Sequence, residues 1–428
     1  MTEGHAAVVS ADGPGAVERS VPLEEASARV LRALEGLGLR PELMRVGETG
    51  DGPTAWRCRL TDRHGVVPAG AQGAGKGRGA EARVGAVFEA LEHFLTGPAS
   101  FAAGQVRLRR AGQVAGELAA QAGAVLLART PDARLGCWRY AAPYTGEELY
   151  VPVFLSSPWY AEDSGRPLRE RAGDRYDYRA VGRYASNSGS AIGVTGTEAT
   201  VHALNEVIER DACSLLLTRA FLADGHRPVL IDPDALPDDL AELWRTVRDM
   251  IGAPVWLLDI TTDVGVPTTM AYVAPTARRP HLRGSGTSLS PRYAAHRALT
   301  ELLQAFLLGD NASAGDDPFA HLDVLRPYPA LYRCGRMDLT GHLERAHTVA
   351  FADRPVPGTL DGHQRGLVEA LSRQGLAVYR RDVRVLPGGI TSVHVFVPGM
   401  ENFGVVTQGI PLLPGPRAAQ AARRGADR

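Results

Sequence analysis

The run Ser188-Gly-Ser-Ala-Ile-Gly-Val-Thr195, followed by Ala203-Leu-Asn-Glu-Val-Ile-Glu-Arg-Asp211, indicates the fold class of this 428-residue chain. A loop of small residues leads into a helix that we expect from about Glu198 to Leu222, with Thr197 as its N-cap. Apolar residues recur along this helix at helical spacing, and the opposite face is polar. The polar positions are His202, Asn205, Glu206, Glu209 and Arg210. The pattern predicts a helix that buries one side and presents carboxylates on the other.

Two other Gly/Ser-rich runs precede helices of the same kind. The turn at 69–79 precedes a helix expected over Glu81–Leu95, and the loop Gly284–Ser288 precedes a helix that begins at Ser290-Pro291. The aligned polar positions are Gly85, Glu89, Glu92 and His93 on the first helix, and Arg297, Glu301 and Gln304 on the second. For one helix alone, a solvated face with an ordinary i,i+4 ion pair is the simpler interpretation. Three such helices after flexible loops instead favour a phosphate-binding cleft with magnesium on the carboxylates.

Lys76 is the only lysine among the 47 basic residues. A lone lysine among arginines suggests that its compact ammonium is needed there, with chance survival as the alternative. Gly70–Lys76 also fits G-x-x-x-x-G-K, the beginning of a P-loop. Gly77 stands where a P-loop needs a magnesium-binding hydroxyl, and no buried strand precedes the run. We therefore do not expect a P-loop.

Helix and strand patterns are interspersed along the chain. Strands are expected at 56–60, 66–67, 255–260, 268–273, 377–383 and 393–397. The fold class is therefore α+β (mixed α/β) with a mostly antiparallel sheet. Residues 1–20 read as disordered, 21–410 as one catalytic domain and 411–428 as a flexible tail that contains proline and arginine. The charged stretch 160–179 reads as an exposed loop.

Composition excludes several classes of function. The formal net charge of −1 gives no general attraction to nucleic acid or to an anionic membrane. No apolar run is long enough for a membrane span, and the N-terminus does not read as a signal peptide, so we expect a cytoplasmic protein. The four cysteines form no C-x-x-C pair, which favours reduced thiols over a zinc site or a disulfide framework.

Four motifs in order resemble the YcaO family of ATP-dependent enzymes that activate peptide backbone amides. They are A-x-x-G-A-V-F-E-A-L-E-H after Gly-Lys-Gly, the Ser188–Asp211 run, R-A-L-T-E-L-L-Q, and the late V-F-V-P-G-M-E. Gly85 and His93 depart from the serine and arginine of the family's first motif. The resemblance runs from about Gly73 to Glu401 and implies helices around a central ATP cleft. The implied ATP and Mg2+ contacts are Lys76, Glu89, Glu92, His93, His202, Asn205, Glu209, Arg210, Glu301 and Gln304. Among these, Glu89, Glu92, Glu209 and Glu301 would hold the metal, and Lys76 and Arg297 would be catalytic.

The resemblance implies cyclodehydration of Cys, Ser or Thr in a ribosomally made precursor peptide, which gives a thiazoline or oxazoline in natural-product or antibiotic biosynthesis. Thioamide formation with a TfuA-type partner and macrocyclic amidine formation are the alternatives within the family. A non-catalytic scaffold that binds the precursor peptide is the alternative of another class, and Gly85 and His93 favour it. The expected partners are the peptide and a leader-binding or TfuA-type protein, with a homodimer left open.

Overall fold

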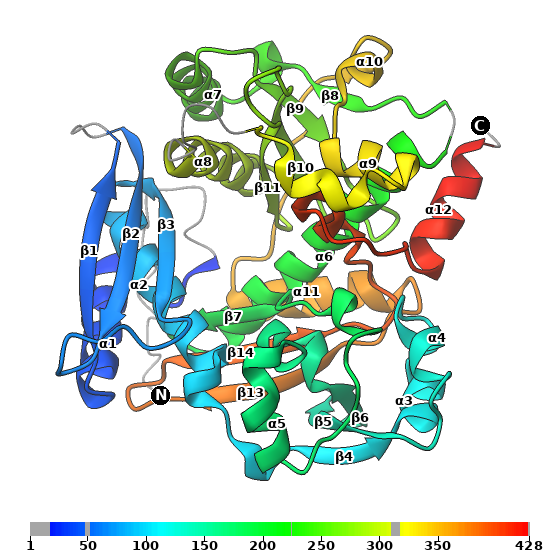
Figure 1. Cartoon of the computed structure of the whole chain (residues 1–428). Coiled ribbons are helices and arrows are strands. Elements are labelled where there is room, and N and C mark those ends of the chain that lie inside the picture. The colour runs from blue at the N-terminus through cyan, green and yellow to red at the C-terminus, as the bar shows by residue number, and fades with distance from the viewer. Residues whose placement is uncertain (1–17, 48–51, 224, 310–316, 427–428) are drawn as a thin grey trace, which may run out of the picture.

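The computed structural model describes residues 18–47, 52–223, 225–309 and 317–426, and it shows three sheets with helices packed against them (Figure 1). The strand orders are β1-β2-β3, β11-β10-β9-β8-β12 and β4-β5-β13-β14-β7, with β6 paired to β5. Among the described strands only β8 and β12 pair in parallel. The α+β class with mostly antiparallel sheets is confirmed.

The elements have the following bounds. The strands are β1 Arg40–Val46, β2 Pro53–Thr61, β3 Gln72–Arg78, β4 Arg107–Arg110, β5 Arg134–Ala141, β6 Glu148–Pro152, β7 Ser190–Gly193, β8 Val229–Ile231, β9 Trp256–Asp259, β10 Thr268–Val273, β11 Leu282–Thr287, β12 His347–Val349, β13 Tyr379–Val385 and β14 Thr391–Phe396. The helices are α1 Leu23–Gly36, α2 Gly79–Thr96, α3 Ala111–Glu117, α4 Ala124–Leu127, α5 Arg166–Arg171, α6 Gly196–Phe221, α7 Asp238–Ile251, α8 Pro291–Gly309, α9 Pro329–Arg336, α10 Thr340–Leu343, α11 Leu360–Ser372 and α12 Pro416–Ala426.

The three helices expected after the Gly/Ser-rich runs are present as α2, α6 and α8. The first and third runs are strands β3 and β11 for most of their length, and β7 occupies the middle of the run at 188–195, so their prediction as loops is wrong. The N-cap of α6 is Thr195 rather than Thr197, because the Thr195 side chain accepts the backbone N–H of Glu198. Ser290 does open α8, since its hydroxyl accepts from the Tyr293 N–H at 3.2 Å.

The glycines of these strands let each strand lie directly against the helix that follows it. A Cβ on Gly75 of β3 would lie 1.7 Å from the carbonyl oxygen of Ala82 in α2, and a Cβ on Gly284 of β11 would lie 2.1 Å from the Leu302 nitrogen in α8. In β7, a Cβ on Gly193 would lie 2.8 Å from the α6 backbone. Only glycine permits such an approach. The contact fixes which face of each helix turns toward the strand and which faces its neighbours.

The stretch at 160–179 is not an exposed loop. It contains α5, and Tyr160, Asp174 and Tyr178 in it are buried. The Asp174 carboxylate accepts hydrogen bonds from the Gly136 N–H of β5 and from the hydroxyls of Tyr160 and Tyr178, at 2.7–2.8 Å. A buried carboxylate with three donors ties the segment to the six-stranded sheet.

The two chain ends also differ from the expectation. Residues 1–17 lie outside the described residues, whereas Glu18, expected in a disordered segment, is buried. The expected flexible tail contains α12, which packs against Leu215 of α6. No helix in the described ranges is long and apolar enough to cross a membrane, and all four cysteines are buried free thiols.

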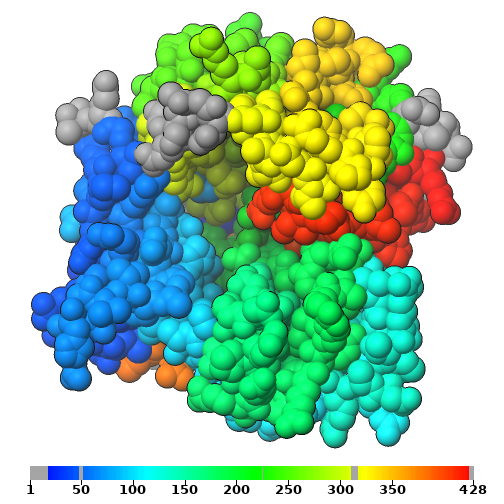
Figure 2. Space-filling view, viewed as in Figure 1, coloured from blue at the N-terminus to red at the C-terminus, as the bar shows by residue number. Residues whose placement is uncertain are grey.

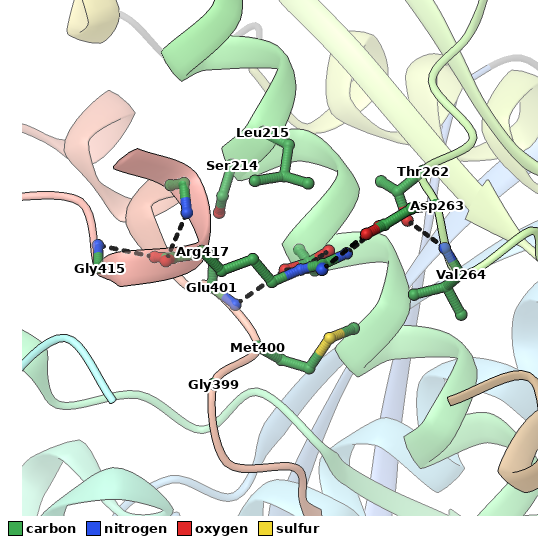
Figure 3. A network of polar contacts seen from close by, with 12 residues as sticks. Ser214, Leu215, Thr262, Asp263, Val264, Gly399, Met400, Glu401, Gly415 and Arg417 are labelled. Atoms are coloured by element: carbon green, nitrogen blue, oxygen red, sulfur yellow. Dashed lines mark hydrogen bonds and ion pairs between the residues drawn. The ribbon is translucent and has the colours of Figure 1, made fainter. Parts of the chain in front are cut away.

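A polar network holds α12 to the rest of the molecule (Figure 3). Arg417 donates to both carboxylate oxygens of the fully buried Asp211, at 2.9 and 3.1 Å, and also pairs with Asp263. The Glu401 carboxylate accepts the N–H groups of Gly415 and Ala418, each at 2.9 Å, at the start of α12. A carboxylate at a helix N-terminus is stabilised by the unpaired N–H groups there. The network therefore joins α12 to α6.

Replacing Gly75 by Ala should lower the free energy of unfolding by at least about 3 kcal/mol, because its Cβ would collide with backbone atoms of α2 rather than with a side chain that can move. Urea unfolding followed by circular dichroism measures the change. Gly79→Ala at the start of α2 is the matched control, since a Cβ there meets nothing within 4 Å. Equal stability of the two variants would show that β3 does not need this close approach.

Replacing Arg417 by Ala should lower the free energy of unfolding by about 3–5 kcal/mol, because it leaves a buried Asp211 carboxylate without its cation. Burial already raises the pKa of Asp211 despite the opposing effect of Arg417. Arg423→Ala, at an exposed position of the same helix, should change stability little. The measurement is urea unfolding at pH 7, and an equal loss in both variants would contradict the role of the network.

Candidate functional site

Strand β3 lies between α2 and α8 and joins their polar faces. The Lys76 ammonium pairs with the Glu301 carboxylate of α8. Gln304 of α8 donates to the Ala74 carbonyl oxygen at 2.9 Å, and the Ala74 backbone N–H bonds Glu89 of α2. The expectation that Lys76, Glu89, Glu301 and Gln304 lie together is therefore realised around one strand. Figure 2 shows this face of the molecule hollowed at its centre, between the β1–β3 layer and the segments of α5 and α9.

Helix α6 adds carboxylates to the same cluster. Glu209 is 4% exposed and acts electrostatically on Glu301, Arg210 and Arg297, and Glu206 pairs with Arg210 at 3.4 Å. Its burial contradicts the solvated face that the simpler interpretation of the helix gave it. Three separate segments of the chain thus meet around a group of buried charges.

Burial makes the ionised form of most of these acids unfavourable. It raises the pKa values of Glu89, Glu206 and Glu209, and it raises the pKa of Glu92 well above the usual range, where Glu206 and Glu89 add repulsion. Glu301 differs. Burial acts to raise its pKa, but Lys76 and Arg210 outweigh it and hold the pKa at about 2. The largest influences on the pKa of Glu92 therefore include no cation, whereas Lys76 and Arg210 act on Glu301.

Two arginines supply further positive charge. Burial acts to lower the pKa of Arg297, but Tyr293 and the carboxylates of Glu209 and Glu301 raise it above its ordinary value. Arg210 is held charged in the same way by Glu206 and Glu209. Fixed cations of this kind are suited to bind the phosphates of a nucleotide.

The two histidines lie at the margins of the cluster. The His93 Nδ1 donates to the Gln72 carbonyl oxygen at 2.6 Å, at the far end of β3 from Lys76. The His202 Nε2 lies 2.7 Å from the Arg19 guanidinium, and burial together with Arg19 and Arg297 lowers the pKa of His202 well below its usual range. Both residues have partners within the chain, and their expected roles as nucleotide contacts remain predictions.

The carboxylates fit a divalent cation by charge. Within the described ranges, no group of three or more His, Cys, Asp and Glu side chains is arranged as a ready metal site. Oxygen ligands are nevertheless what Mg2+ prefers, and it binds through one or two carboxylates plus substrate phosphates. Buried acids with raised pKa values gain most from a nearby cation, because it stabilises their ionised forms. The donor set is therefore compatible with Mg2+.

Sequence reasoning missed Glu18, Ser288 and His363, which lie beside Asn205. The Glu18 carboxylate accepts hydrogen bonds from Asn205 and from the Ser288 hydroxyl, and lies 3.7 Å from the His363 Nδ1. Glu18 stands in a glycine-rich polar stretch with no periodic pattern, and His363 belongs to a helix outside the motifs. Ser288 ends the third Gly/Ser-rich run, which was the one signal available.

The chain matches a family model described as YcaO cyclodehydratase, ATP- and Mg2+-binding, over residues 74–401. The matched range contains α2, α6, α8 and most of β3, the elements that build the cluster. The match confirms the resemblance stated from the motifs, and it confirms ATP and Mg2+ as the expected cofactors.

Individual similar proteins were also found. A protein of Rhizobium leguminosarum bv. trifolii, named for its place in the tfuA 3′ region, is 28% identical over 247 residues, which are 53% of this chain and 55% of that protein. A Methanothermobacter thermautotrophicus protein is 32% identical over 231 residues, 52% of this chain and 57% of its own length. The chain thus spans little more than half the length of these relatives. The structure of YcaO from Methanopyrus kandleri, bound with AMPPCP and Mg2+, is 20% identical with a TM-score of 0.63 over 93% of this chain and 97% of that one, a likeness of fold.

Glu92 and Glu301 should respond oppositely to neutralisation in protein free of nucleotide and divalent cations. Glu92→Gln should raise the free energy of unfolding at pH 8, since burial and the repulsion from Glu206 and Glu89 raise the pKa of Glu92 well above its usual range and disfavour its ionised form. A carboxyl whose pKa is raised in the folded state lowers the stability of the fold most at a pH above that pKa. The stability gained by Glu92→Gln should therefore shrink as the pH falls toward the unfolded-state pKa, because Glu92 becomes protonated in both states.

Glu301→Gln should lower stability by about 2 kcal/mol at pH 8, because Lys76 loses a charged hydrogen-bond partner. The depressed pKa of Glu301 means that its contribution exists above the unfolded-state pKa and is lost as the pH falls toward 2. Urea unfolding of both variants between pH 4 and pH 8 measures the two profiles. Changes of the same sign would contradict the charge distribution described here.

Proposed function

Because this chain belongs to the YcaO family, we propose that it is an ATP-dependent enzyme that activates backbone amides of a ribosomally made precursor peptide. The reaction proposed first is cyclodehydration, in which a Cys, Ser or Thr side chain attacks the preceding amide carbonyl. The resulting oxyanion takes the γ-phosphoryl group, and phosphate then leaves to give a thiazoline or oxazoline. We place this reaction in the cytoplasm. The observation that supports it is that acids and cations from β3, α2, α6 and α8 meet in one electrostatic cluster.

The chain's own residues would position and neutralise the phosphates. Lys76, Arg210 and Arg297 would face the phosphate oxygens, where fixed cations need no reorganisation as charge develops. Glu89, Glu92, Glu209 and Glu301 would hold Mg2+, which supplies charge neutralisation at the phosphates. Because Lys76 bonds Glu301, a phosphate that contacts the ammonium and a metal that contacts the carboxylate would compete with this pair.

Thioamide formation is the second candidate, and one observation favours it. The Rhizobium relative is named for the tfuA 3′ region, which suggests a TfuA-type partner for this chain as well. Here sulfide, rather than a side chain of the peptide, would attack the activated amide carbon. The two candidates share ATP use and differ in the mass of the product, since cyclodehydration removes one water per residue and thioamidation replaces oxygen by sulfur.

ATP hydrolysis distinguishes a non-catalytic scaffold from the two enzymatic candidates. Gly85 and His93 are the departures that favour it, but position 85 has room for the family's serine, because a Cβ there meets only the Gly75 Cα at 3.7 Å. Gly85→Ser should therefore fold normally. A scaffold would hydrolyse no ATP in either form, whereas an enzyme should retain hydrolysis in the wild type.

Glu209→Gln should lower ATP turnover at least about 100-fold, because it removes a buried charge proposed to hold the metal. The variant should keep its fold, since burial already disfavours the ionised form of Glu209. Glu369→Gln, exposed on α11, is the control. Phosphate release in the presence of a precursor peptide encoded nearby, followed by mass spectrometry of that peptide, gives both the rate and the product. Unchanged turnover in Glu209→Gln would exclude the metal role.

A further inference from the structure

The segment Glu18–Ser20 lies on the half of α6 that carries the expected nucleotide contacts. Glu18 is 1% exposed, and its carboxylate accepts a hydrogen bond from the Asn205 Nδ2 at 3.2 Å. The next residue, Arg19, contacts His202 at 2.7 Å and pairs with Glu198 at 3.2 Å. The Ser20 N–H donates to the Glu198 carboxylate at 3.1 Å. The segment thus covers Asn205 and His202.

The pocket around the Glu18 carboxylate is built for an anion. Its contacts are hydrogen-bond donors, namely the Asn205 amide and the Ser288 hydroxyl, and Arg297 is an electrostatic neighbour. The His363 Nε2 donates to the Pro357 carbonyl oxygen at 2.9 Å, so its Nδ1, 3.7 Å from Glu18, is a donor toward the anion only when the ring is protonated. An amide, a hydroxyl and a guanidinium are the groups that bind phosphate oxygens as well as carboxylates.

We infer that Glu18 is an internal competitor, which fills with its carboxylate a phosphate-binding pocket of Asn205, Ser288 and Arg297 and is displaced when an anionic ligand binds. The inference rests on the proposed function, because it takes the nucleotide's phosphate to be the ligand. It adds Ser288 to the site and assigns the segment Glu18–Ser20 a regulatory role.

The pocket is incompletely satisfied by Glu18. The Asn205 Oδ1, the Arg297 Nε and the His363 Nδ1 are buried without a hydrogen-bond partner in the described structure. Leaving buried polar atoms unpaired costs free energy. The Arg297 Nε–H can donate to a phosphate oxygen, and the Asn205 Oδ1 can accept from a water or bind a cation that comes with the polyphosphate, so such a ligand can satisfy more of these atoms than one carboxylate does. Glu18 is therefore a partial substitute that a better ligand can replace.

Glu18→Ala and Glu18→Gln should tighten binding of ATP with Mg2+, measured by isothermal titration calorimetry on the full chain. If the pocket is open about one-tenth of the time, release of the segment lowers the dissociation constant about 10-fold. Arg19→Ala, whose side chain is half exposed, should act in the same direction with less effect on the fold. Glu24→Gln, exposed on α1, is the control and should leave the constant unchanged.

A weaker or unchanged affinity in both Glu18 variants would overturn the inference, since a metal ligand or an inert residue would behave in these ways. A second measurement does not depend on the nucleotide. Hydrogen exchange of a peptide that covers residues 18–22 should speed up in the wild type when inorganic pyrophosphate is added, because the Ser20 N–H loses Glu198. Protection that persists at saturating pyrophosphate would also overturn it. If neither the wild type nor any variant binds ATP but pyrophosphate still releases the segment, the proposed function is contradicted whereas the anion-binding pocket is supported.

Discussion

The close approach of glycine-bearing strands to the helices that follow them is the constraint on which the rest of this structure depends. β3 lies against α2, β7 against α6 and β11 against α8, in each case at a distance that excludes a side chain. A helix held by its backbone has little freedom to rotate about its axis. The carboxylates of α2, α6 and α8 are therefore turned toward one another by packing, before any ligand supplies an attractive charge. Desolvation of these acids is the cost of that arrangement, and the raised pKa values of Glu92 and Glu209 express it.

Helix periodicity was strong enough to predict α2, α6 and α8, and the Ser290-Pro291 pair located the start of α8. The strands below these helices were missed for a physical reason. Strand prediction relies on β-branched and aromatic residues in alternation, and β3 and β11 are rich in glycine and serine. Their glycines do alternate, at 73, 75 and 77 and at 284 and 286, and they serve contact with a helix backbone, but a glycine carries no apolar side chain by which a strand is recognised. A glycine-rich run is equally typical of a phosphate-binding loop, so composition alone could not distinguish the two structures.

The site shows the same division between local and long-range information. Glu89, Glu209, Glu301 and Lys76 came from motifs, and the structure brings them into one electrostatic cluster. Glu18 could not be found in this way, because it meets Asn205 across 187 positions of sequence and stands in a stretch without pattern. Arg417 is similar, since its partner Asp211 lies in α6. Such pairs depend on the completed fold, and for that reason the expectation was wrong for Glu18 and for the tail that contains α12.

Because arginine supplies all other basic side chains, Lys76 is a unique site for chemical labelling. Its side chain is 23% exposed and points at Glu301, and no other lysine exists in the sequence. Reagents that acylate primary amines can therefore modify this protein at only one side chain, apart from the terminal amine. Covalent labelling with such a reagent would report directly whether Lys76 is covered by a ligand, with a chemical selectivity that a lysine-rich homologue would not offer.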